Sequence, residues 1–124
     1  MIRALTSWGP AALWAAALFV LSSRPSIPGP SFPFADTVGH LGLYGILGGL
    51  LAWGVLRSDA AGRWRWVVLG ALYGGTDEWH QSFVPGRTAA VDDLVADAIG
   101  VTLGFFIGTW ILERVWTRLR EQEA

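Results

Sequence analysis

The chain has 124 residues, of which 52% are hydrophobic and only 15% are charged. Soluble domains carry about 25% charged residues, so this composition argues against a soluble enzyme and favours an integral membrane protein. The net charge of −1 leaves no basic surface for nucleic acid, and the absence of cysteine excludes disulfides, thiolate nucleophiles and zinc–thiolate sites.

Four stretches approach the roughly 20 apolar residues that a membrane-spanning helix needs. In chain order, they cover about residues 7–21, 37–56, 64–83 and 93–115. A proline-rich segment from Pro25 to Pro33, a polar turn over residues 57–63 and the sequence Pro85-Gly86-Arg87 separate them. The sequence therefore predicts an all-α, four-helix transmembrane bundle, with residues 1–124 forming one domain.

The distribution of arginine predicts the orientation of this bundle. Seven of the nine basic residues, all of them arginine, fall at one side of the predicted spans, and only Arg24 and Arg87 fall at the other. Cytoplasmic segments carry the excess of positive charge, so both termini are expected in the cytoplasm.

Small residues occur at the spacing that lets membrane helices approach closely. The G-x-x-x-G pairs are Gly45/Gly49, Gly70/Gly74 and the run Gly100/Gly104/Gly108. In a four-span protein every helix has neighbours in its own chain, so we expect these faces to pack within the bundle rather than to form a dimer.

Polar side chains gather where the spans reach the outer surface. In the second span, Asp36, His40 and Tyr44 are spaced four residues apart and share a helix face. Near the end of the third span, one face contains four polar residues: Tyr73, Asp77, His80 and Gln81. Glu78 points about 100° away from Asp77.

The beginning of the fourth span adds two more carboxylates, because Asp93 and Asp97 lie one turn apart. Arg87 precedes that span, and Ser22, Ser23 and Arg24 follow the first. Since the second and fourth spans descend from the outer face while the third ascends to it, all these residues are expected at one end. A charged side chain within a span costs on the order of 3 kcal/mol, so it normally has a partner or a task.

Three interpretations of this end are open. The charges can be purely structural, as helix caps and bundle partners. His40 and His80, with some of the carboxylates, can bind zinc or manganese and activate water; no fixed ligand spacing is present, and we assign no metal ligands. Thirdly, Arg87, with Arg24, can contact an anionic head group in a bidentate manner.

Several segments resemble the VanZ-like family of small bacterial membrane proteins. They are Ser22-Ser23, residues 36–40 with Tyr44, the long element 77–87 (DEWHQSFVPGR) and residues 93–100 (DLVADAIG). The resemblance implies a multi-pass protein of the bacterial cytoplasmic membrane and the cell envelope. The family is named for a protein linked to resistance to the glycopeptide antibiotic teicoplanin, so an antibiotic-resistance role is an expectation at family level only.

We therefore expect a VanZ-like cell-envelope protein with a polar pocket on the extracytoplasmic side. The expected partners are membrane lipids, including a lipid-linked cell-wall precursor, and the sequence identifies neither a cofactor nor an oligomeric state. The expected ligand-binding residues are Arg87, Asp77, Glu78, His80, Gln81, Asp36, His40, Tyr44, Asp93 and Asp97.

Two alternatives use the same residues. One is a membrane-embedded metal-dependent or acid–base hydrolase, in which His80 or His40 acts as the base beside Asp77 and Glu78. The other is an assembly partner that binds no ligand, and whose charges stabilise the bundle.

Overall fold

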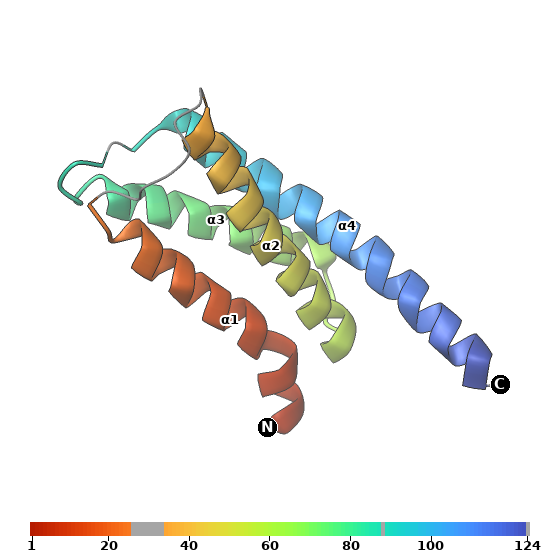
Figure 1. The fold of residues 1–124 in the computed structure, drawn as a ribbon. Helices are drawn as coiled ribbons and strands as arrows, with labels where there is room; N and C mark the ends of the chain where they lie inside the picture. The colour runs from red at the N-terminus through yellow and green to blue at the C-terminus, as the bar shows by residue number, and fades with distance from the viewer. Residues whose placement is uncertain (26–33, 88, 124) are drawn as a thin grey trace.

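The computed structural model describes residues 1–25, 34–87 and 89–123, and these form four α-helices (Figure 1). The helices are α1 (Ile2–Ser22), α2 (Ala35–Ser58), α3 (Arg63–Gln81) and α4 (Val91–Glu123). The described part of the chain contains no strand, so the predicted all-α class is confirmed. Most of the proline-rich segment, from residue 26 to residue 33, lies outside the described residues.

Three of the helices, α1, α2 and α4, are long and apolar enough to cross a membrane. The remaining helix, α3, has 19 residues and contains four charged side chains: Arg63, Arg65, Asp77 and Glu78. Since these charges lie in its first and last turns, the apolar stretch between them is shorter than in the other helices.

The first helix begins at Ile2, five residues before the stretch expected from the sequence, so that Pro10 lies inside it. Proline has no backbone N–H, which leaves the carbonyl of Thr6, four residues earlier, without its helical donor. The indole N–H of Trp53 in α2 donates to that carbonyl over 3.0 Å. This bond satisfies the free carbonyl and joins α1 to α2.

Helices α2 and α4 pack closely along a seam of glycines. A Cβ atom at Gly48 would meet the backbone of Val101 and Phe105, and one at Gly104 would meet the carbonyl of Gly45. On α3, a Cβ at Gly70 would lie 2.7 Å from the side chain of Val101. The G-x-x-x-G faces therefore pack within the chain, as the sequence analysis expects.

Helices α1 and α3 end, and α2 and α4 begin, at the same end of the bundle (Figure 1). This end carries the carboxylates of Asp77, Glu78, Asp93 and Asp97. We call it the polar end. Both chain termini lie toward the opposite end. There the guanidinium of Arg3 pairs with Asp59 at 2.8 Å, and the rings of Trp8 and Trp66 stack with centroids 4.0 Å apart.

Candidate functional site

His40 lies at the centre of the polar end, in the second turn of α2. Its Nδ1 atom is 2.9 Å from Oδ1 of Asp97 in α4 and 3.7 Å from Oε1 of Glu78 in α3. The Asp97 side chain is fully buried, and that of His40 is 13% exposed. One imidazole therefore faces carboxylates from two other helices.

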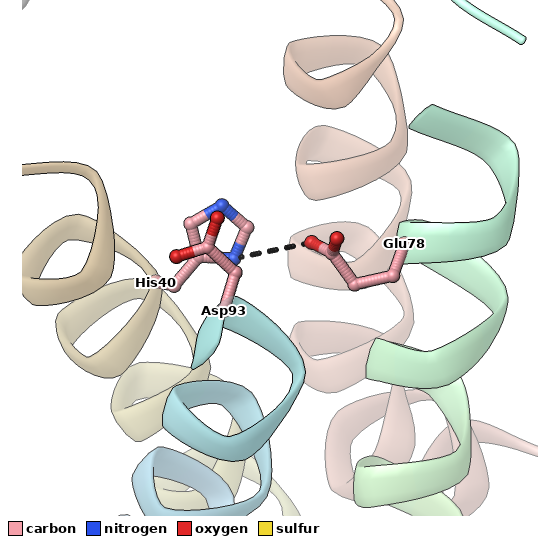
Figure 2. A group of neighbouring side chains, drawn as sticks. All are labelled: His40, Glu78 and Asp93. Atoms are coloured by element: carbon pink, nitrogen blue, oxygen red, sulfur yellow. Dashed lines mark ion pairs between the residues drawn. The ribbon is translucent and has the colours of Figure 1, made fainter. Parts of the chain in front are cut away.

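Asp93, one turn before Asp97 in α4, completes this group. One ligand atom from each of His40, Glu78 and Asp93 lies within 4.8 Å of the others (Figure 2). We call His40, Glu78, Asp93 and Asp97 the His40 cluster.

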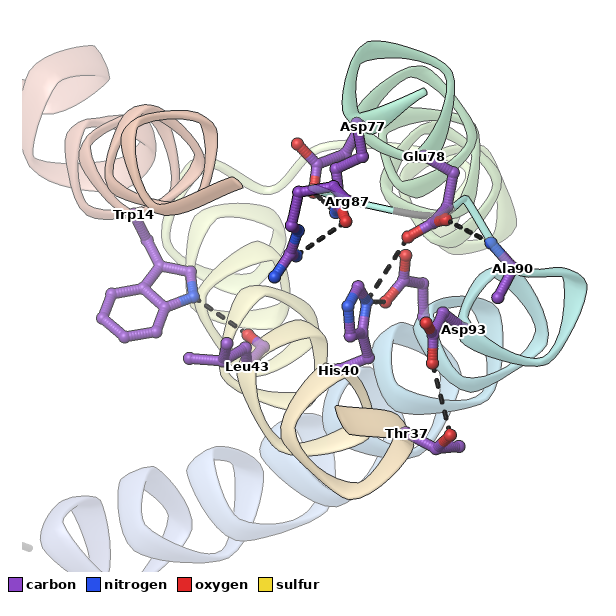
Figure 3. A network of polar contacts seen from close by, with 11 residues as sticks. Trp14, Thr37, His40, Leu43, Asp77, Glu78, Arg87, Ala90 and Asp93 are labelled. Atoms are coloured by element: carbon purple, nitrogen blue, oxygen red, sulfur yellow. Dashed lines mark hydrogen bonds and ion pairs between the residues drawn. The ribbon is translucent and has the colours of Figure 1, made fainter. Parts of the chain in front are cut away.

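Two groups that the sequence analysis missed hold these carboxylates in place. The hydroxyl of Thr37 donates to Oδ1 of Asp93 over 3.2 Å, and the backbone N–H of Ala90 donates to Oε2 of Glu78 over 3.1 Å (Figure 3). Thr37 lies three residues before His40 in α2, and this spacing could have predicted that its hydroxyl lies near the same helix face. Ala90 contributes only its backbone, for which the sequence contains no signal.

Arg87 belongs to a separate chain of hydrogen bonds. Its Nη2 donates to Oε1 of Gln81 over 2.7 Å, and Nε2 of Gln81 donates to Oδ2 of Asp77 over 3.3 Å. Figure 3 shows the Arg87 side chain between the helices, beside Asp77. The buried Gln81 amide thus stands between the guanidinium and the buried carboxylate.

A turn over residues 84–87 directs Arg87 back toward α3. The N–H of Arg87 donates to the carbonyl of Val84 over 3.1 Å, and Gly86 has a φ of 81°. A proline followed by a residue with positive φ is typical of a type II turn, in which glycine is preferred at that position. The turn at Pro85-Gly86 therefore directs the guanidinium back toward Gln81 of α3 rather than away from the helices.

His80 lies apart from the His40 cluster. Its Nε2 is 3.0 Å from the hydroxyl of Ser23, and its ring centroid is 4.6 Å from that of Phe19, so it contacts α1. The structure therefore brings only one of the two histidines to the carboxylates, and the expectation of a shared metal site for both does not fit this arrangement.

The two other residues expected on the His40 face differ in depth. Asp36 is exposed in the first turn of α2. Tyr44 is 1% exposed, and its ring lies parallel to that of His40 with centroids 6.3 Å apart. Tyr44 therefore lies buried one turn after His40 in α2, whereas Asp36 lies exposed one turn before it.

An apolar groove of about 340 Å³ lies between α1 and α3, over α2; we call it the α1–α3 groove. It is lined by Trp8, Ala11, Ala12, Ala15, Leu47, Leu51, Trp66, Leu69, Gly70 and Tyr73. The hydroxyl of Tyr73 donates to the carbonyl of Ala15 over 2.6 Å, which joins the two helices at the end of the groove nearer to the polar end.

The polar end thus offers two kinds of chemistry. Arg87 presents a guanidinium that donates to a neutral amide, which suits an anion. The His40 cluster presents one imidazole and three carboxylates, which suits a cation.

Comparison with known proteins gives one match. The family model described as VanZ/LLP1 matches residues 5–112, a range that includes the groove, Arg87 and the whole His40 cluster. No curated protein and no solved structure matches the chain.

Proposed function

The chain belongs to the VanZ/LLP1 family, and from this premise we propose that it is a cell-envelope membrane protein whose polar end binds the anionic head group of a lipid. Arg87 makes the anion contact, and the α1–α3 groove receives the acyl or prenyl chain. Asp77 and Gln81 orient the arginine.

The bonding of Arg87 is the observation that carries the proposal. Its guanidinium is half-buried and donates to the neutral oxygen of Gln81. Within the described residues, no carboxylate lies within ion-pair distance of it. Arginine is the side chain best suited to bidentate binding of phosphate, so remaining N–H groups are available for an anion.

The position of the groove supports a ligand that is also a lipid. Tyr73, which lines the groove, is four residues before Asp77 and eight before Gln81 on α3. These residues follow one helix face, so Tyr73 at the end of the groove lies about two helical turns from Gln81, the hydrogen-bond partner of Arg87. A molecule with an anionic head group and a long apolar chain matches both features.

We further propose that all four helices span the bacterial cytoplasmic membrane, with both termini inside and the polar end outside. The arginine distribution supports this orientation. A lipid-linked cell-wall precursor is the ligand of this chemistry that would connect the protein with the teicoplanin resistance for which the family is named.

Native mass spectrometry of the full chain in mild detergent tests the proposal, with dioleoyl phosphatidate as the anionic probe and dioleoyl phosphatidylcholine as the zwitterionic one. We expect preferential binding of phosphatidate, and a loss of about 10- to 100-fold in affinity in Arg87→Ala, since a hydrogen bond to a charged group contributes about 1.5–3 kcal/mol.

The matched control is Arg118→Ala, because Arg118 is exposed near the opposite end of α4. It removes the same charge and should leave phosphatidate binding unchanged. Equal binding of phosphatidate by the wild type and Arg87→Ala, with both proteins folded, contradicts the proposal. A lower yield of folded Arg87→Ala with unchanged binding by the folded fraction would instead support the purely structural interpretation.

A further inference from the structure

The His40 cluster contains more carboxyl groups than basic side chains that pair with them. Glu78, Asp93 and Asp97 surround one imidazole, which carries at most a single positive charge. Within the described ranges, the ion-pair partner of Glu78 and of Asp97 is this same His40, and no arginine pairs with any of the three carboxylates. Buried charges require a partner, so the cluster as it stands is one that a cation would complete.

One carboxylate oxygen in particular lacks a partner. Glu78 is 6% exposed, and its Oε2 accepts the N–H of Ala90, while Oε1 has no hydrogen-bond partner among the residues described. Figure 2 shows this oxygen directed toward His40, with Asp93 beside the ring. The bond from Ala90 fixes the carboxylate so that Oε1 faces the space between the three side chains.

The spacing of the donor atoms suits one ion. Two ligands of the same ion, each about 2.1 Å from it, lie roughly 3–4 Å apart. The donor atoms of His40, Glu78 and Asp93 lie within 4.8 Å of one another, so small side-chain rotations bring them to coordination distance. The ring atom that faces Oε1 of Glu78 is Nδ1 of His40, which is also 2.9 Å from Oδ1 of Asp97, so an ion bound at Nδ1 would replace the bond to Asp97.

We propose that His40, Glu78 and Asp93 bind a divalent transition-metal cation, which Nδ1 of His40 would coordinate in place of its bond to Asp97. A mixed set of imidazole and carboxylate donors suits Zn²⁺ or Mn²⁺, whereas Mg²⁺ and Ca²⁺ prefer oxygen donors alone. The ligands come from three different helices, so the ion would join α2, α3 and α4 at the polar end. This site is independent of the anion contact at Arg87.

The test uses the full chain, stripped with a chelator and then titrated with Mn²⁺ or Zn²⁺. Binding of Mn²⁺ is followed by electron paramagnetic resonance, and the bound metal is counted by elemental analysis. We expect one ion per chain, a rise in thermal stability with Mn²⁺ or Zn²⁺, and weaker responses to Mg²⁺ and Ca²⁺. Loss of a ligand should weaken binding by about tenfold or more, because removing even an outer-shell partner typically costs 10- to 100-fold.

The test uses two ligand variants, Glu78→Gln and Asp93→Asn, so that metal binding can still be measured if one of them does not fold. Circular dichroism checks the helix content of both. Asp92→Asn is the matched control, because Asp92 is the exposed neighbour of Asp93 in the first turn of α4. Unchanged Mn²⁺ binding in both ligand variants overturns the site, and so does equal weakening in Asp92→Asn. Arg87→Ala should still bind Mn²⁺, so the experiments test the proposed anion site and the proposed cation site independently.

Discussion

Oδ1 of Asp97 lies 2.9 Å from Nδ1 of His40, although 57 residues separate them in the sequence. The contact crosses the closest helix pair of the bundle, α2 and α4. One turn further along α4, the backbone of Gly100 lies beside Leu41 of α2. Because glycines at this seam have no side chains, the two helices approach closely enough for the Asp97 carboxylate to contact the His40 imidazole.

We predict that Asp97→Ala lowers the free energy of unfolding by about 1–3 kcal/mol, because it removes the buried hydrogen-bond partner of His40. Asp97→Asn should cost less than about 1 kcal/mol, since the amide oxygen can still accept from the ring N–H. Thermal or denaturant unfolding in detergent measures both. Equal losses in the two variants would show that the hydrogen bond contributes little.

A carboxylate placed beside Arg87 should compete with an anionic lipid. Gln81→Glu replaces the neutral partner of the guanidinium by a charged one of the same size, and we expect about tenfold weaker phosphatidate binding. Ser82→Glu adds the same charge at the exposed next residue and should have a smaller effect. Native mass spectrometry compares the two, and an unchanged affinity in Gln81→Glu would argue against Arg87 as the anion contact.

A bulky side chain in the α1–α3 groove should affect long lipids only. Ala12→Trp fills the groove from α1. We expect the binding of dioleoyl phosphatidate to weaken on the order of threefold, because its acyl chain loses van der Waals contacts with the groove. Binding of dihexanoyl phosphatidate, whose chains are short, should change little. Ala17→Trp, at an exposed alanine of α1 outside the groove lining, is the control; the same loss there would place the lipid chain elsewhere.

The glycine seam should tolerate no added methyl group where the backbones touch. Gly48→Ala would place Cβ against the backbone of Val101 and Phe105, and we expect a loss of about 1–3 kcal/mol in unfolding free energy. Gly42→Ala, in the same helix with nothing within 4 Å of its Cβ, should be neutral or slightly stabilising. Thermal unfolding in detergent compares them, and equal stability would mean that the seam opens at little cost.

The chain has no cysteine, so single cysteines report the orientation without background. Ser82→Cys lies exposed at the end of α3, and Ala61→Cys lies exposed between α2 and α3. With the polar end outside, a membrane-impermeant maleimide should label position 82 in intact cells and position 61 only after permeabilisation. The reverse pattern would place the polar end in the cytoplasm.

The sequence by itself determined the helical class and the location of the small-residue faces, because apolar length and glycine spacing are properties of single segments. It also placed His40, Glu78 and Asp93 at one end, since helix direction alternates along the chain. Which charged side chains meet was decided only by the tertiary structure. Residues on one helix have fixed angles to one another, but contacts between helices depend on how each helix is rotated and how deeply it packs.

His80 and Arg87 show the difference. Both lie close in sequence to Glu78, yet the packing of α1 turns His80 toward Ser23, and the turn at Gly86 brings Arg87 to Gln81. His40 meets Glu78 and Asp97 because the glycines of α2, α3 and α4 let the three backbones approach until short side chains touch. That depth of approach depends on what each glycine faces, and spacing along the sequence does not contain this information.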